Sequence, residues 1–191
     1  FCYVSHNSIH RPEMDHPDPI AKYEKKPGDD NRDNRPVLAA MLERLDSSVG
    51  RLIARLDELG LAEKTVVIFF GDNGMFGDPE TLKPLRGAKG HLYEAGIREP
   101  LIVRWPGKIK ANSIYDVPVI SNDFYPTLAE LGGHRLGQPD LDGISFVPLL
   151  SSNAGATKET GEPNHQGHNG GPSVWYRWTA LSTGNISFVL N

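Results

Sequence analysis

Residues 65–74 read TVVIFFGDNG and carry the strongest structural signal in the sequence. The continuous apolar run at 65–70 is typical of a strand that is covered on both faces in a parallel sheet. Ahead of it, apolar residues recur every three or four positions from Val37 to Leu59, which predicts a helix that stops at Gly60. A long helix followed by a buried strand is half of a βαβ unit, so the pattern predicts an α/β fold.

Shorter elements are expected after this strand. Six glycines between residues 71 and 96 favour a loop, because glycine disfavours a helix interior. Residues 101–105 are expected to form another strand, residues 123–131 a short helix, and residues 144–150 a short apolar element. The long loop therefore lies at the end of the first strand, where α/β proteins commonly place their sites.

The two ends of the chain have different compositions. Residues 1–5 (FCYVS) have the composition of a buried strand already under way, which suggests that the chain is a fragment of a longer protein. Residues 6–34 are rich in Pro, His and charge, and predict an irregular loop. Residues 151–172 are almost without apolar side chains and predict a boundary, with residues 174–181 and 186–190 as antiparallel strands of a second, smaller sheet.

Composition excludes several classes of protein. The 191 residues include 20 Lys and Arg against 24 Asp and Glu, a net charge of −4, which argues against a nucleic acid partner. The longest apolar runs are far shorter than the roughly 20 residues of a membrane-spanning helix. The single cysteine, Cys2, excludes an internal disulfide and a site built only from thiolates.

Three groups of polar residues could carry chemistry. Asp72 and Asn73 follow the buried strand directly, and their oxygens suit Ca²⁺ or Mg²⁺, although Asp-Asn-Gly taken alone fits an ordinary turn better. Lys89, flanked by glycines and near two other cationic residues, could stabilise a transferring sulfuryl or phosphoryl group, or could simply be solvated. His10, which follows the first expected strand, could act as a general acid.

Several motifs occur together and in order. They are residues 65–74, residues 84–100 (PLRGAKGHLYEAGIREP), residues 101–107 (LIVRWPG), residues 123–128 (DFYPTL) and residues 141–145 (LDGIS). This set resembles the type I, formylglycine-dependent sulfatases of the alkaline phosphatase superfamily. The resemblance implies a mixed sheet with helices on both faces, with residues 1–150 as the C-terminal half of the catalytic domain. Residues 151–191 would begin a small antiparallel C-terminal subdomain.

The resemblance also implies a role for each residue that matches a family motif. Asp72 and Asn73 match ligands of an active-site calcium ion, Lys89 matches the lysine that contacts the sulfate, and His10 matches the histidine that holds the ester and its leaving oxygen. The implied reaction is transfer of SO₃ from an alcohol to formylglycine. The implied substrate is a sulfated small molecule or glycan, acted on outside the cytoplasm, in the periplasm, the lysosome or the secreted fraction.

The family nucleophile is missing from the printed sequence. Formylglycine is made from Cys or Ser in Cys/Ser-x-Pro-Ser/Ala-Arg, and this pentapeptide does not occur here. Cys2 lacks that context and is expected to be a buried apolar residue, so the nucleophile is expected upstream of Phe1. Glu94 and Arg98 are expected to hold the lysine loop, and His91 has no matching role. Alternatives are a phosphodiesterase or phosphonate hydrolase of the same superfamily and a non-catalytic protein that binds sulfated glycans.

Overall fold

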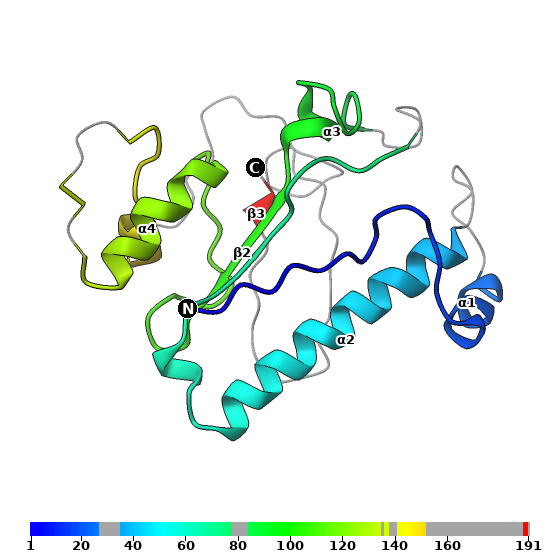
Figure 1. The fold of residues 1–191 in the computed structure, drawn as a ribbon, viewed down its shortest axis with the longest axis horizontal. Helices are drawn as coiled ribbons and strands as arrows, with labels where there is room; N and C mark the ends of the chain where they lie inside the picture. The colour runs from blue at the N-terminus through cyan, green and yellow to red at the C-terminus, as the bar shows by residue number, and fades with distance from the viewer. Residues whose placement is uncertain (27–34, 78–83, 135, 138–140, 152–188, 191) are drawn as a thin grey trace. The chain divides into compact units, whose positions relative to one another are not determined.

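The computed structural model describes residues 1–26, 35–77, 84–134, 136–137, 141–151 and 189–190. They form two compact units, residues 1–61 and the described residues from 62 onward. Figure 1 labels elements of both units, and each unit is described by itself below.

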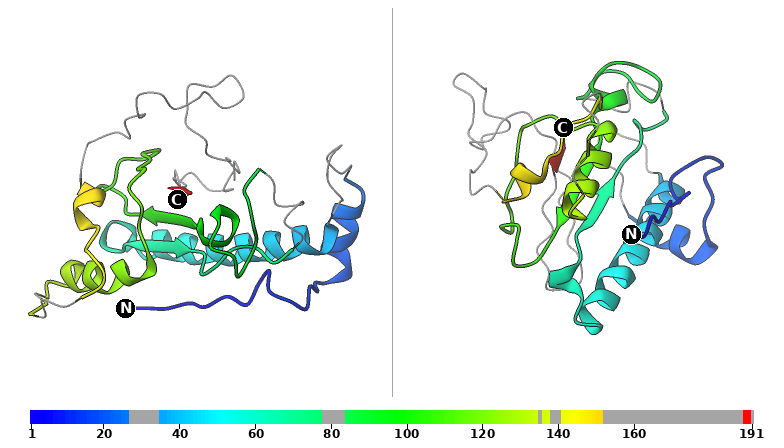
Figure 2. Two further views of the ribbon diagram at one scale, coloured as in Figure 1. Left: turned by 90° about the horizontal axis from the view of Figure 1, so that it is seen from above. Right: turned by 60° about the vertical axis from the view of Figure 1, so that its left-hand side comes forward.

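The first unit is a pair of helices. Helix α2 (Pro36–Glu58) carries the predicted apolar stripe, buries Ala40, Met41 and Ile53, and ends before Gly60, whose φ of 64° fits the predicted stop. Helix α1 (Pro17–Glu24) lies beside the beginning of α2 (Figures 1 and 2) and was expected to be irregular loop. Its two prolines, Pro17 and Pro19, both lie in the first turn, where the backbone N–H groups have no partner within the helix. A Pro-rich composition was therefore a misleading signal there.

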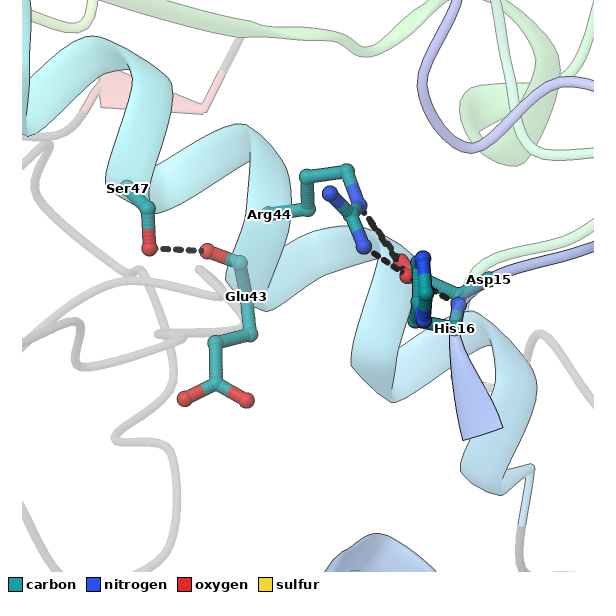
Figure 3. A network of polar contacts seen from close by, with 5 residues as sticks. All are labelled: Asp15, His16, Glu43, Arg44 and Ser47. Atoms are coloured by element: carbon teal, nitrogen blue, oxygen red, sulfur yellow. Dashed lines mark hydrogen bonds and ion pairs between the residues drawn. The ribbon is translucent and has the colours of Figure 1, made fainter. Parts of the chain in front are cut away.

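Ionic contacts fasten α1 and the residues before it to α2. The Nε of Arg44 donates to both carboxylate oxygens of Asp15 at 3.0 Å, and the Asp15 side chain is only 1% exposed. Figure 3 shows this pair next to Glu43, whose backbone oxygen accepts a hydrogen bond of 2.9 Å from Ser47. The carboxylate of Glu43 pairs with Lys22 of α1. The Arg44 guanidinium holds the pKa of Asp15 below its ordinary value.

The opening residues do not form the predicted strand. Residues 1–7 have no regular secondary structure and are all exposed. Cys2, which was expected to be buried, is among them. A strand depends on hydrogen bonds to a neighbouring strand, and no strand within the described residues pairs with this segment. Both expectations were therefore wrong for the structure described.

The second unit is built on a small sheet. Strands β1 (Val67–Phe70) and β2 (Pro100–Arg104) pair antiparallel, with Phe70 opposite Leu101, and β3 (Val189–Leu190) pairs antiparallel with the other edge of β2. We expected residues 65–70 to belong to a parallel sheet covered on both faces. Because β1 pairs antiparallel with β2, its neighbour among the described residues, the parallel pairing is wrong there, and β1 is only half-buried. A parallel pair needs a crossover helix, whereas the described part of the connection holds only the single turn α3 (Glu94–Ile97).

The C-terminal expectations are mostly outside the described residues. Residues 152–188 are not described, so the domain boundary after residue 150 and the strand at 174–181 stay predictions. The described part of the expected strand at 186–190 pairs with β2, not with a separate sheet.

Short helices also belong to this unit, and one of them contacts the sheet through an aromatic ring. They are η1 (Ala62–Lys64), η3 (Ser121–Asp123), α4 (Phe124–Leu131) and α5 (Val147–Ser151). Phe124 of α4 contacts Phe70 of β1 with ring centroids 4.7 Å apart, and it contacts Phe146 at 5.7 Å, both edge to face. Such pairs add to the stabilisation that burial itself provides. The predicted helix at 123–131 is thus confirmed, and it covers the end of β1 that leads to Asp72.

Polar contacts join two sequence motifs in this unit. The Asp123 carboxylate accepts hydrogen bonds from the N–H groups of Ile120 at 2.9 Å and Ile144 at 2.7 Å. The hydroxyl of Thr127, which is fully buried, donates to the Asp123 carbonyl at 2.6 Å and accepts from the Phe146 N–H at 2.9 Å. These contacts join the motif at residues 123–128 to the segment that begins with the motif at residues 141–145. Within the described ranges, no helix is long and apolar enough to cross a bilayer.

Replacing Asp15 with Asn is expected to lower the melting temperature at pH 7 by a few degrees, because it leaves Arg44 without its buried partner. The folded-state pKa of Asp15 lies below the ordinary 3.8, so its stabilisation is complete above that pH and is lost as the pH falls through the folded value. The melting temperatures of the two proteins should therefore converge as the pH falls below 3.8. Glu58→Gln, in an exposed pair with Arg55, is the matched control and should change little.

Candidate active site

The loop after β1 packs directly on the backbone of α3. Gly74 donates its N–H to the Gly96 carbonyl at 3.2 Å, and a Cβ at position 74 would lie 2.2 Å from the Ala95 oxygen. Only glycine fits so close an approach. This contact fixes the loop that carries Asp72 and Asn73. The Asn73 side-chain amide donates to Asp72 Oδ1 at 3.3 Å.

The lysine loop forms a tight turn against the same segment. The backbone N–H of Lys89 donates to the Met75 carbonyl at 3.0 Å, and the glycines on either side, Gly87 and Gly90, have φ of 89° and 87°. These angles are in the left-handed region that favours glycine. The Lys89 side chain is half-buried and makes no hydrogen bond or ion pair with the described residues. Its charge is therefore available to a ligand.

His91, which sequence reasoning left without a role, supports this turn. Its Nδ1 accepts a hydrogen bond of 3.1 Å from the Ala88 N–H, so the acceptor nitrogen carries no proton and the ring is held beside Lys89. The His91 carbonyl lies only 2.0 Å from where a Cβ on Gly96 would be, which again requires glycine.

The other charged residues of the loop are used to hold it. The Arg86 guanidinium lies 3.8 Å from the centre of the Tyr93 ring and donates to its hydroxyl at 2.9 Å. Arg98 pairs with Glu94 across α3 at 3.3 Å, in agreement with the structural role expected for both. Lys83, the third cationic residue of the motif, lies outside the described residues.

Glu99 is a site residue that the sequence reasoning did not single out. It precedes β2 and, with Asp72 and Asn73, lines a cavity of about 230 Å³ beyond the end of β1. Burial, and then the negative charge of Asp72, raise the pKa of Glu99 to about 7. The available signal was an acid at the start of a buried strand, Arg98-Glu99-Pro100, but one residue in that position has no distinctive spacing.

The remaining predicted residue, His10, belongs to the unit of residues 1–61 and is described only within it. Its side chain is exposed, and its Nδ1 lies 2.9 Å from the Arg11 carbonyl oxygen, to which it donates. The other ring nitrogen, Nε2, would then be the one that can face a substrate.

The oxygen donors at the end of β1 are of the type that a hard cation prefers, but they are too few to fill its coordination shell. Asp72, Asn73 and Glu99 offer carboxylate and amide oxygens around one cavity, which are the atoms that Ca²⁺ prefers. Among the described residues, however, no group of three or more His, Cys, Asp or Glu could hold a metal ion. A calcium shell of about six to eight oxygens would need further ligands.

Comparison with known proteins identifies the family of these motifs. Residues 1–134 match the family model described as Sulfatase. A protein of Formosa agariphila named Sulfatase is 39% identical over 162 residues, which are 78% of this chain and 29% of that protein. The chain thus spans less than a third of that relative.

Solved structures give the same answer for the fold. The crystal structure of Ps i-CgsB in complex with k-i-k-neocarrahexaose has a TM-score of 0.62 at 29% identity, covering 73% of this chain and 30% of that chain. The structure of BT4656 in complex with its substrate D-glucosamine-2-N,6-O-disulfate has a TM-score of 0.56 at 30% identity, covering 64% of this chain and 24% of that chain. The expected α/β fold class is confirmed.

Gly74→Ala is expected to destabilise the second unit by about 1–3 kcal/mol or more, since the new Cβ would meet a backbone oxygen that has little freedom to move. Gly50→Ala is the control, because position 50 lies inside α2 with nothing within 4 Å of a Cβ. That change should stabilise by about 0.5–1 kcal/mol. Thermal unfolding of both variants measures the difference, and equal melting temperatures would refute the close approach.

Proposed function

Because this chain belongs to the sulfatase family, we propose that it is part of an enzyme that hydrolyses sulfate esters, with Lys89, Asp72 and Asn73 at the reaction site. One observation carries the proposal. The Lys89 N–H binds the Met75 carbonyl, so a backbone hydrogen bond joins the turn that bears the unpaired lysine to the loop that bears the two oxygen donors. A sulfate ester is an anion, and a site for it needs fixed positive charge.

Each residue has a chemical task in this proposal. Lys89 binds the sulfuryl oxygens and counters the negative charge that develops on them as the S–O bond to the alcohol breaks. His10, described only within its own unit, is proposed from its match to the family motif as the residue that gives a proton to the departing alcohol oxygen. Asp72 and Asn73 would hold Ca²⁺, which when bound adds further positive charge at the sulfuryl group. His91 keeps the lysine turn in place through its bond to Ala88.

The nucleophile is proposed to be a formylglycine supplied by residues that precede Phe1 in a longer protein. The printed sequence holds no Cys/Ser-x-Pro-x-Arg, and Cys2 lies in an exposed segment without that context. The coverage of 29% of the Formosa agariphila relative supports a longer protein. A carbohydrate substrate is supported by the two structural neighbours, whose complexes contain a neocarrahexaose and a disulfated glucosamine.

The complete protein that contains this chain is therefore expected to hydrolyse an aryl sulfate. Assays with an aryl sulfate and an aryl phosphate diester, side by side, separate the possible activities. Turnover of the diester in preference to the sulfate would favour a phosphodiesterase, and turnover of neither, with retained binding of a sulfated oligosaccharide, would favour a binding protein. Only the first substrate is expected to react at a substantial rate.

Lys89→Ala in the complete protein is expected to lower kcat for the aryl sulfate by about 10²–10³, the usual cost of one preorganised charge donor. The melting temperature should be nearly unchanged, because the Lys89 side chain pairs with no described residue. Lys108→Ala, an exposed lysine in a turn of the same unit, is the matched control and should keep full activity. Normal kinetics in Lys89→Ala would return this lysine to a solvated role.

Asp72→Ala is expected to reduce calcium binding by the complete protein, since it removes one of two proposed ligands. Calorimetry measures the affinity directly, and metal analysis gives the bound amount. The 191-residue chain alone should bind calcium weakly, because two ligands leave most of the shell to water. Calcium content that is the same with and without Asp72 would contradict the assignment.

A further inference from the structure

The carboxylate of Glu99 has an unusual environment. Its Oε1 atom is buried and has no hydrogen-bond partner within the described residues. A buried carboxylate oxygen without a partner is costly, and natural proteins normally satisfy such atoms. An unsatisfied oxygen beside the proposed site calls for a partner that the described residues do not supply.

The backbone around Glu99 keeps its side chain close to the Asp72 loop. Gly71 donates its N–H to the Pro100 carbonyl at 3.0 Å, which ties the end of β1 to the start of β2. A Cβ on Gly71 would lie only 2.9 Å from Glu99 Oε2. The φ of Gly71 is not in the left-handed region, so this position uses glycine for the room it leaves to the carboxylate.

The charges at this place repel one another in the absence of a cation. Asp72 and Glu99 line the same cavity together with Asn73, so two carboxylates share one space. Glu94, five residues earlier, has a quite different setting, since it is exposed and paired with Arg98. Arg98 thus pairs with Glu94, whereas Glu99 lines the cavity together with the oxygen donors Asp72 and Asn73.

We infer that Glu99 is a positioning residue of the cation site at Asp72 and Asn73, where its carboxylate adds a second negative charge and accepts a hydrogen bond from a cation-bound water or binds the ion directly. This inference rests on the proposed calcium site and extends it to a residue that the family motifs did not assign. The two carboxylates would be drawn together by the divalent cation, which removes their repulsion.

The test is calcium affinity, measured by calorimetry on the complete protein at about pH 8, where carboxylates are ionised. Glu99→Gln keeps the size of the side chain and removes its charge, and it should weaken binding by about 10–100-fold, the usual cost of losing an outer-shell partner. Glu94→Gln removes an exposed charge from the same loop and should bind like the wild type. Unchanged affinity in Glu99→Gln would overturn the inference.

Asp72→Ala separates failure of the inference from failure of the proposed function. If Asp72→Ala loses calcium while Glu99→Gln binds like the wild type, only the role of Glu99 is wrong. If the wild type binds no calcium, the cation site and the role of Glu99 both fail.

Two further measurements exclude a purely structural role. The melting temperature of metal-free Glu99→Gln should be unchanged or higher, because an unpartnered charge has been removed. A clear fall would instead indicate a protein cation as the partner of Glu99 and would overturn the inference.

Gly71→Ala should also weaken calcium binding, by displacing the carboxylate of Glu99. In the Glu99→Gln background, Gly71→Ala should change the calcium affinity little. If the two substitutions instead lower the affinity additively, Gly71→Ala does not act through the Glu99 carboxylate.

Discussion

The approach of two backbones at Gly74 and Gly96 is the constraint on which the site depends. Gly74 hydrogen-bonds to the Gly96 carbonyl, and a side chain at either position would overlap backbone oxygens at 2.0–2.2 Å. This contact joins the loop after β1 to α3. The bond from Lys89 to Met75 then places a cationic turn beside a loop of oxygen donors. Catalysis by fixed charges requires such preorganisation, since mobile groups would lose free energy to reorganisation.

The use of charge differs between the two units. In the first unit Asp15 is buried and fully paired with Arg44, so its charge stabilises the contact between the helices. In the second unit Glu99 is partly buried with an unpaired oxygen, and Lys89 has no described partner. Paired charges are typical of structural contacts, whereas unpaired charges near a cavity are a cost that a ligand can repay on binding. The same residue chemistry thus serves the fold in one place and the site in another.

Sequence reasoning predicted the elements whose signals are local. The 3.6-residue period of α2, the glycine stop after it and the apolar run of β1 were all visible, as were Asp72, Asn73 and Lys89 as candidates. It missed features that depend on contacts between distant residues. The antiparallel partner of β1 is β2, which begins thirty residues after β1 ends. Helix α1 is stabilised by an ion pair to α2 that no local sequence pattern reveals. Glu99 was missed for the same reason, because its neighbours come from the other strand.

The oxygen donors of the site set a physical limit on what this stretch of sequence can do by itself. Even if Glu99 binds directly, Asp72, Asn73 and Glu99 supply fewer oxygens than the six to eight that calcium commonly takes. Water could complete the shell, but water neither fixes the ion nor adds the negative charge that tight binding needs. For the proposed calcium site and formylglycine, the further ligands and the nucleophile would be supplied by residues other than these; the chain spans 29% of its Formosa agariphila relative. Binding of the ion would therefore join these residues to the Asp72 loop, so that assembly of the site and folding are coupled.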